Sequence, residues 1–278
     1  MGSTTGNFAD GELEVVQHLF PIEGKPPKRI YVPKGAFIGT VFQFTRPWDF
    51  GFLCNLYKNA ARGGSFLEVG ANIGTDTIVA AEFFQRCYCF EPLPAHVELL
   101  RKNMELNHIT NVQLFPMAVS DRAGTARFFV NTRSTGSSSL YPNDRDMDQS
   151  EEVQAVTLDA AMPLEIRDVT FMHIDTEGHD IKVLQGARQF IGRQGQRPLV
   201  RMEFQPRTLA LHGSHVAELL EFIRQFRYAP FMDAASHLVP LSQQMLIDMF
   251  HLWRSTEGWI DIFLLPAGLE QSSVLKVG

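Results

Sequence analysis

A glycine-containing turn and an acidic residue stand where the first two regular strands of the sequence are expected to end. The segment Gly70-Ala71-Asn72-Ile73-Gly74 closes one apolar stretch, and Glu91 follows the next one, 21 residues after Gly70. Glycines at a strand-to-helix turn let a ligand approach the backbone, and the first N–H groups of the helix face it. An acid at the end of the second strand can accept both hydroxyls of a ribose.

The glycine spacing indicates which kind of nucleoside this turn suits. It is G-x-x-x-G rather than the G-x-G-x-x-G of dinucleotide binders, and Asn72 replaces the glycine that lets a pyrophosphate approach. The pattern favours a nucleoside without a diphosphate, of which S-adenosylmethionine is the commonest. Alternatively, the turn at Gly70 is only a tight turn and Glu91 is only a solvated strand end. The occurrence of both features at this spacing makes each of these alternatives weaker.

A second group of reactive side chains follows the apolar stretch Val169–Ile174. Asp175, Glu177 and His179 come directly after it, at the carboxyl end of a predicted strand, where open α/β sheets bind their ligands. A buried acid is costly unless it is partnered or used, and histidine has the pKa range of a general base. We expect these three residues to be catalytic. Alternatively, Glu177 and Asp180 only favour the N-terminus of the following helix.

Two further residues are candidates for binding a substrate. Glu203 ends the stretch Pro198–Phe204, where it either contacts an acceptor or pairs with Arg201 or Arg207. Trp48 belongs to an aromatic group that forms either a substrate wall or ordinary core packing. His212 and His215 have an H-x-x-H spacing, but no third ligand is nearby in the sequence, so we expect no metal there. A magnesium ion held by Asp175, Glu177 and His179 is the minor alternative to a reaction without a metal.

The elements that must position these residues alternate regularly from Ser65 onward. The pattern predicts strands at 66–70, 87–90, 112–119, 125–130, 152–158, 169–174, 198–204 and 259–265, and helices at 74–84, 94–107, 181–191 and 216–226. Strands that alternate with helices indicate parallel βαβ units and an α/β sheet. Residues 1–63 lack a regular period. We expect them to form an N-terminal extension or substrate cap on a domain at 64–268, with a tail at 269–278.

The composition of the 278 residues narrows the class of protein. No apolar run is long enough to span a membrane, and the N-terminus does not resemble a signal peptide. The three cysteines cannot form a closed disulfide framework, so a reducing cytoplasm is expected. A net charge of −6 argues against a large nucleic-acid interface. Oligomeric state is left open.

The ordered motifs of residues 64–205 resemble FkbM-type S-adenosylmethionine-dependent methyltransferases. The matching segments are Glu68 to Gly74, Phe90 to Pro94, Leu100 to Asn103, Leu106-Asn107, Asn111-Val112, Ala118 to Asp121, Ser138 to Leu140, Thr157 to Asp159, Ile174 to Asp180 and Val183 to Ala187. The family usually has Asp where Glu68 stands and often Glu where Asp180 stands. Both differences keep the charge.

This resemblance implies a class I methyltransferase fold, a mixed seven-stranded sheet with helices on both faces. It further implies methyl transfer from S-adenosylmethionine, without a metal, to a hydroxyl oxygen of a small molecule such as a sugar, a glycoside or a polyketide-type natural product. The residues expected at the cofactor are Glu68, Gly70, Ala71, Asn72, Gly74, Glu91, Pro92, Ala118, Val119, Ser120, Ser138 and Asp175. For Ser138, a flexible polar loop is the alternative.

Two other functions compete with methyl transfer. A nicotinamide-dependent oxidoreductase could use the same turn and acid, but the phosphate glycine and a Tyr-x-x-x-Lys pair are missing. A non-catalytic binding module on a methyltransferase fold could bind the cofactor without turnover. A nucleic-acid substrate is not expected, because the basic residues of the N-terminal segment are few and local.

Overall fold

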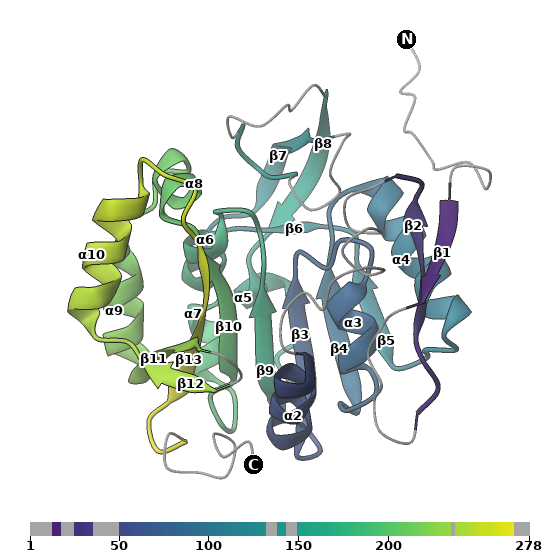
Figure 1. The fold of residues 1–278 in the computed structure, drawn as a ribbon, viewed down its shortest axis with the longest axis horizontal. Helices are drawn as coiled ribbons and strands as arrows, with labels where there is room; N and C mark the ends of the chain where they lie inside the picture. Colours follow the sequence, from purple (N-terminus) through teal and green to yellow (C-terminus); the bar gives the residue numbers. More distant parts are fainter. Residues whose placement is uncertain are drawn as a thin grey trace.

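The computed structural model describes residues 13–17, 25–35, 50–131, 138–142, 149–234 and 237–269. These residues form a mixed β-sheet with helices on both faces and a smaller sheet beyond its carboxyl edge (Figure 1). The expected α/β, Rossmann-like class is confirmed. None of the helices in the described ranges is long and apolar enough to cross a membrane.

The main sheet has eight strands, not the expected seven. In order across the sheet they are β12 (Leu238–Pro240), β11 (Tyr228–Asp233), β13 (Ile260–Pro266), β10 (Leu199–Phe204), β9 (Val169–Ile174), β3 (Ser65–Val69), β4 (Arg86–Phe90) and β5 (Val112–Phe115). The strands from β10 to β5 are parallel, whereas β13 is antiparallel to β10 and β11. Neither β11 nor β12 was expected from the sequence. Strand β12 is too short to show an alternating pattern, and its Pro240 suits a sheet edge.

Helices cover each face of the sheet and bury a separate hydrophobic cluster there. One face carries α2 (Phe50–Ala61), α3 (Thr75–Ala80) and α4 (Pro94–Leu106). The other carries α5 (Leu158–Ala161), α6 (Asp180–Gln185), α7 (Arg188–Gly192), α8 (Pro206–Leu211), α9 (Val216–Phe226) and α10 (Gln243–Trp253). Apolar side chains on both faces explain why the central strands read as nearly continuous hydrophobic runs.

The face that carries α2 and α3 changes from apolar to polar along the strands. Phe66, Phe171 and Leu199 fill its lower part, where Phe66 and Phe171 stack with ring centroids 5.8 Å apart. Strand alternation then brings charged side chains to the same face, and the register places Glu68 beside His173 and His173 beside Arg201. A buried polar row therefore crosses three central strands just below their carboxyl ends.

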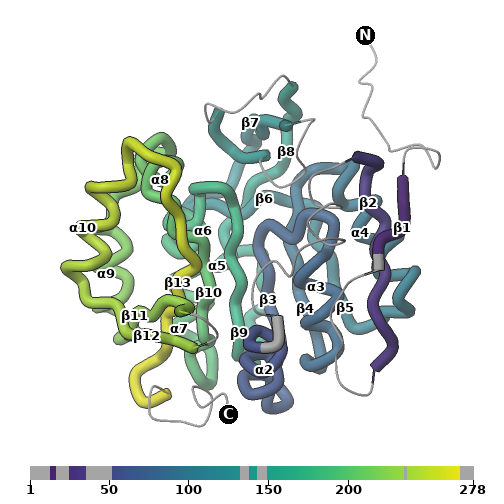
Figure 2. The backbone as a smooth tube through the Cα atoms, viewed as in Figure 1, coloured from purple at the N-terminus to yellow at the C-terminus, as the bar shows by residue number. Residues whose placement is uncertain are grey.

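The described parts of the N-terminal segment pack directly on this α/β core. Strands β1 (Leu13–Gln17) and β2 (Arg29–Pro33) pair antiparallel and lie beside α4 (Figure 2). The amide side chain of Asn103 bonds both the N–H and the carbonyl of Tyr31, at 2.6 and 3.2 Å. On α2, Tyr57 is fully buried against Phe171, at a centroid distance of 5.0 Å. Regular structure is thus present where the sequence showed no period.

Two predicted elements are divided in the structure. The strand expected at 112–119 is two strands, because Pro116 breaks the run: β5 stays in the main sheet, while β6 (Ala118–Val119) pairs with β8 (Gln149–Val156). Strand β8 also pairs with β7 (Gly124–Val130) to complete the small sheet. The helix expected at 181–191 is α6 and α7, separated at Gly186, where a Cβ would lie 2.0 Å from the Ser120 carbonyl.

Candidate functional site

The turn after β3 touches the end of β9. Gly70 has φ of 89°, and a Cβ there would lie 1.8 Å from the carbonyl oxygen of Asp175. The N–H of Asp175 in turn donates to the carbonyl of Val69 at 2.9 Å. Only glycine permits this approach. The predicted cofactor turn and the predicted catalytic acid are therefore neighbours.

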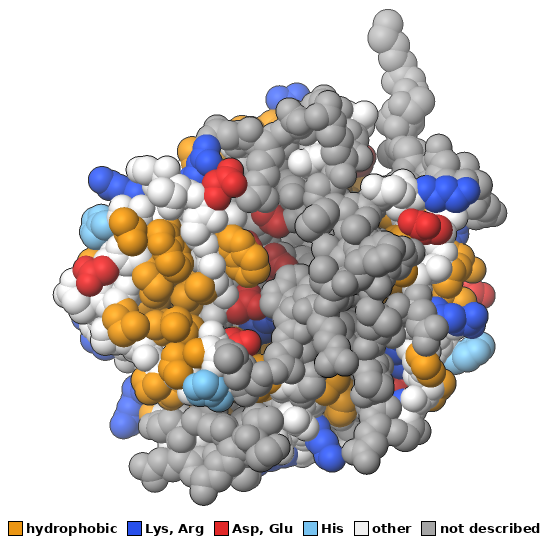
Figure 3. All heavy atoms as spheres, in the orientation of Figure 1, with side chains coloured by type: hydrophobic (Ala, Val, Ile, Leu, Met, Phe, Trp, Pro, Cys, Tyr) orange, Lys and Arg blue, Asp and Glu red, His pale blue; other side chains and the backbone are white. Residues whose placement is uncertain are grey.

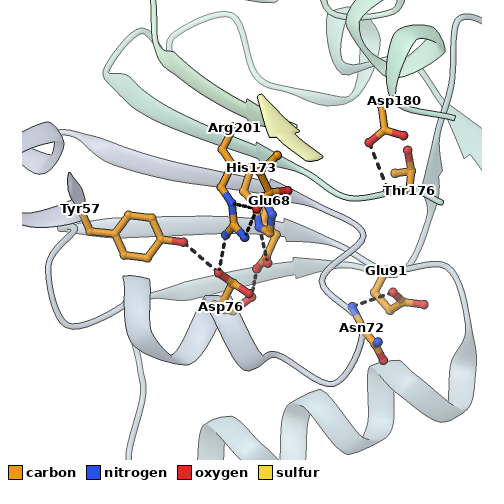
Figure 4. Close-up of polar contacts among 11 residues, drawn as sticks. Tyr57, Glu68, Asn72, Asp76, Glu91, His173, Thr176, Asp180 and Arg201 are labelled. Carbon is orange, nitrogen blue, oxygen red and sulfur yellow. Dashed lines mark hydrogen bonds and ion pairs between the residues drawn. The ribbon is translucent and has the colours of Figure 1, made fainter. Parts of the chain in front are cut away.

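Glu91 organises the glycine turn through its carboxylate. One oxygen accepts the N–H of Asn72 at 2.9 Å and the other accepts the N–H of Leu93 at 3.0 Å (Figure 4). The side chain is buried, with His96 Nδ1 at 3.5 Å. Each carboxylate oxygen can accept a further hydrogen bond, so these two acceptors fit the hydroxyls of a ribose.

The remaining residues expected at the turn fall into two groups. Ala71 is buried, Asn72 and Pro92 are half-buried, and Gly74 begins α3 with φ of 91°. These four line the turn itself. Glu68 does not, because its buried carboxylate accepts the hydroxyl of Thr77 and pairs with His173 Nδ1 at 3.2 Å.

A buried ionic network lies beneath the site and includes residues that the sequence did not single out. Arg201 donates to Asp76 at 3.1 Å and to Asp261 at 2.7 and 3.0 Å. Tyr57 also donates to Asp76, at 3.1 Å (Figure 4). The sequence feature that could have identified Arg201 is its charge within the apolar strand Leu199–Phe204, because a buried charge needs a buried partner of opposite sign.

The charged groups of this network shift one another's pKa values. Burial raises the pKa of Glu68, whereas its bond to His173 opposes that effect. Burial and Arg201 lower the pKa of His173, but Asp76 and Glu68 outweigh them and raise it. Burial disfavours the guanidinium of Arg201, yet Asp261 and Asp76 raise its pKa well above the usual range. Arg201 is therefore a permanent cation under the carboxyl edge.

Three of the predicted site acids meet at this edge. One carboxylate oxygen from each of Asp175, Glu177 and Glu203 lies within 4.8 Å of the others. Burial raises the pKa of Glu203 well above its usual range, and Glu177 and Asp175 add to the effect. Figure 3 shows acidic side chains along a hollow on this face, beside hydrophobic side chains over α10 and β13. Such an oxygen cluster could remove a proton or hold a divalent cation.

Asp180 holds the loop that presents these acids. Its buried carboxylate accepts the N–H of Gly178 at 3.1 Å and the N–H of Thr176 at 3.4 Å (Figure 4). Burial and the nearby Asp175 raise its pKa to about 7, against the effect of those two N–H donors. Glu177 in this loop has φ of 53°, a left-handed conformation.

His179 lies with a different set of residues from the acids that precede it. Its Nε2 is 2.9 Å from the hydroxyl of Ser120, and the titratable groups that act on it are His212, Asp121, Lys182 and Arg122. Burial lowers its pKa to about 3. The structure therefore brings Asp175, Glu177 and Glu203 together but leaves His179 apart from them.

The other expected cofactor residues belong to the small sheet. Ala118 and Val119 form β6 and are buried, and the N–H of Ser120 continues this pairing to the carbonyl of Val156 at 2.8 Å. The hydroxyl of Ser138 accepts the N–H of Asn131 at 3.0 Å. Trp48, the expected substrate residue, lies outside the described residues.

The fold and the glycine turn with its acid define a Rossmann-like methyltransferase. The family described as the methyltransferase FkbM domain matches residues 68–230, and the chain belongs to this family. Membership confirms the expected resemblance and, with it, S-adenosylmethionine as the cofactor. No curated protein matches the sequence.

Several solved structures are similar to the chain at low identity. A Streptococcus mutans protein solved in complex with SAH has a TM-score of 0.45 and 10% identity, covering 78% of this chain and 97% of that one. An rRNA methylase from Streptococcus thermophilus has a TM-score of 0.44 and 11% identity, with coverages of 81% and 99%. A precorrin-6y C5,15-methyltransferase from Geobacter metallireducens has a TM-score of 0.41 and 10% identity, with coverages of 77% and 88%.

Proposed function

We propose that this methyltransferase transfers its methyl group to a hydroxyl oxygen of a small molecule, such as a sugar, a glycoside or a polyketide-type product. The observation that carries this proposal is the meeting of Asp175, Glu177 and Glu203 beside the glycine turn. A hydroxyl is a weak nucleophile until its proton is removed, and carboxylates close together provide a base.

The cofactor end of the site uses residues of the turn after β3 and of the end of β9, which meet where Gly70 touches the carbonyl of Asp175. Glu91 offers hydroxyl acceptors, while Gly70, Ala71 and Asn72 form the adjoining backbone. S-adenosylmethionine supplies a methyl group made electrophilic by its sulfonium. Asp175 lies at the junction of the two halves, where its carboxylate stabilises a nearby cation.

The acceptor end of the site uses the acids beyond this junction. Glu203 has a pKa raised well above its usual range, so it holds a proton more strongly than an ordinary carboxyl. Glu177 and Asp175 place further carboxylate oxygens next to it, and the mutual repulsion of their negative charges favours transfer of the acceptor's proton to this group of carboxylates. We therefore assign the role of general base to the three carboxylates as a group. The left-handed backbone at Glu177 positions its carboxylate within this group.

A small molecule is favoured over a nucleic acid by the charge of the protein. The net charge is −6, and Asp175, Glu177 and Glu203 gather at the edge of the sheet that would receive the acceptor. A polyphosphate backbone would be repelled there. The cytoplasmic location expected from the cysteine content belongs to the same proposal.

The first experiment separates binding from chemistry. Calorimetry with S-adenosylhomocysteine tests the cofactor site, and methyl-labelled S-adenosylmethionine tests transfer to a panel of sugars, glycosides, macrolides and RNA. We expect binding, and label in a hydroxyl-bearing small molecule. Label in RNA alone would contradict the proposed acceptor class. So would the absence of label in every acceptor by protein that binds S-adenosylhomocysteine, a result that would favour a non-catalytic binding module.

Variants then test the carboxylates. We expect Asp175→Asn and Glu203→Gln each to lower kcat by about 10²-fold or more. Glu203→Gln should weaken the binding of S-adenosylhomocysteine less than Asp175→Asn does. Glu105→Gln, at an exposed position of α4, is the matched control and should leave both unchanged. Full activity of the Glu203→Gln variant would remove Glu203 from the acceptor site.

A further inference from the structure

A second group of buried polar side chains lies apart from the acids and takes no part in the methyl transfer proposed above. His179 directly precedes α6, His212 directly follows α8, and both are only 3% exposed. Their ring centroids are 6.0 Å apart. Tyr141 lies against both rings, with its centroid 4.9 Å from that of His212 and 5.8 Å from that of His179.

Hydrogen bonding around Ser120 fixes the tautomer of His179. The Ser120 hydroxyl donates to Asp121 Oδ1 at 3.0 Å, because an ionised carboxylate only accepts. The single hydroxyl proton is then used, so the 2.9 Å contact must be a donation from His179 Nε2–H to Ser120 Oγ. His179 Nδ1 therefore carries a lone pair. This atom is buried, has no partner among the described residues and does not cap α6.

His212 offers a second lone pair. Both of its ring nitrogens are buried, and neither forms a hydrogen bond to a described residue. Burial lowers the pKa of His212 to about 4, although a backbone contact with Gly178, outside ordinary hydrogen-bond geometry, raises it and uses at most one of the two ring nitrogens. A neutral imidazole has one N–H and one lone pair. Leaving such groups buried and unsatisfied costs about 1–3 kcal/mol each, so the arrangement calls for a ligand.

The spacing of the rings is close to that needed to share one metal ion. A Zn–N bond of about 2.1 Å, added to the roughly 1.1 Å from a ring nitrogen to its centroid, puts each centroid about 3 Å from the ion. At a tetrahedral angle two such centroids stand about 5 Å apart, so the two rings, now 6.0 Å apart, would have to approach by about 1 Å to share one ion. In addition, the Nε2–H of His179 is oriented by Ser120 and Asp121, as the second nitrogen of a metal-binding histidine usually is.

We propose that His179 Nδ1 and a ring nitrogen of His212 bind a transition-metal cation, with Zn²⁺ as the commonest candidate and water completing the coordination. Neutral nitrogen ligands without a carboxylate favour Zn²⁺, Co²⁺ or Cu²⁺ over Mg²⁺. The acids Asp175, Glu177 and Glu203 would instead favour a hard cation such as Mg²⁺. The two clusters are therefore distinguishable by the metal that they prefer.

Titration of the full chain with Co²⁺ tests the site, since nitrogen-bound Co²⁺ absorbs visible light. We expect one equivalent to bind, Zn²⁺ to displace it, and Mg²⁺ to leave it in place. His179→Gln and His212→Gln should each weaken binding at least about tenfold, whereas His251→Gln, at an exposed position of α10, should bind as the wild type. Unchanged binding by both variants, or none by the folded wild type, would overturn the proposal.

A second measurement does not depend on the variants folding. Crystals of the wild-type chain soaked in Co²⁺ should show an anomalous peak between the rings of His179 and His212. A peak at Asp175, Glu177 and Glu203 alone would overturn the assignment and place the ion among the acids. Methyl transfer is not used as a readout, so the outcome is independent of the proposed function.

Discussion

Single residues set the site by letting backbone segments meet that a side chain would keep apart. The contact between Gly70 and the carbonyl of Asp175 joins the cofactor turn to the acids, and the left-handed conformation of Glu177 turns its carboxylate toward Glu203. Arg201 supplies the cation beneath them. Each of these roles can be removed by one substitution.

Gly70→Ala should destabilise the protein and weaken cofactor binding together. Its cost combines a left-handed conformation, about 1–2 kcal/mol, with a collision that forces β3 and β9 apart. Gly213→Ala is the matched control, because Gly213 has φ of 72° but nothing described within 4 Å of the added Cβ. In urea denaturation we expect Gly70→Ala to lose at least about 2 kcal/mol more than the control. Equal losses would mean that the strand contact is dispensable.

Arg201→Met should leave Asp76 and Asp261 as buried acids without their cation. Removing one partner of a buried ion pair costs about 3–5 kcal/mol. The matched control is Arg207→Met, which breaks a pair with Glu257 at 3.5 Å on the surface and should cost less than about 1 kcal/mol. Urea denaturation of both variants measures the difference, and a similar small cost for Arg201→Met would show that the acids are neutral in the folded state.

At the scale of elements, strand β2 and helix α4 support the cofactor turn from outside the sheet. Asn103 bonds Tyr31 on β2 and also donates to the carbonyl of Ile73 at 2.9 Å, inside the glycine turn. One fully buried amide thus ties the N-terminal segment to the cofactor site. We expect changes in this segment to reach the cofactor through α4.

Asn103→Ala tests that connection. Loss of its bonds leaves buried backbone groups unsatisfied and should cost about 1–3 kcal/mol. Hydrogen exchange should quicken in β2 and in the turn at Ile73, and S-adenosylhomocysteine should bind more weakly. Asn107→Ala removes similar bonds to Arg29, at 2.6 and 3.0 Å, but none to the turn. It should loosen β2 while leaving the affinity unchanged, and equal affinities of the two variants would refute the link.

Elements with a strong period could be predicted from the sequence, and elements that depend on partners could not. The βα alternation from β3 to α4 was visible because β3 and β4 are apolar runs buried on both faces and α4 buries one face. Gly70, Glu91 and Asp175 could be found because they stand at strand ends. The role of Arg201 was not visible, because Asp261 reaches it only through the antiparallel pairing of β13 with β10. The short strand β12 and the break at Pro116 likewise depend on which sheet receives the chain.

At the scale of the whole molecule, the loop between β9 and α6 separates two kinds of titratable groups. Asp175, Glu177 and Asp180 act on Glu203 on one side, while His179 and His212 lie together on the other. Both histidines have pKa values below their usual range, at about 3 and about 4. They therefore make the folded state more stable as pH rises toward 6.5, in the opposite sense to a buried acid with a raised pKa.

The effect of Asp180 on the pH dependence of stability should appear when the wild type is compared with Asp180→Asn. The folded-state pKa of Asp180 is raised from 3.8 to about 7, so between these values the folded protein holds a proton that the unfolded chain releases. Its contribution to stability is full below about pH 4 and is lost as pH rises through 7, at up to about 1.4 kcal/mol per unit. The histidine effect is common to both proteins and cancels in their difference. Urea denaturation of both between about pH 4.5 and 7.5 should therefore show the wild type losing stability relative to Asp180→Asn, and a constant difference would mean that Asp180 is ionised in the folded state throughout.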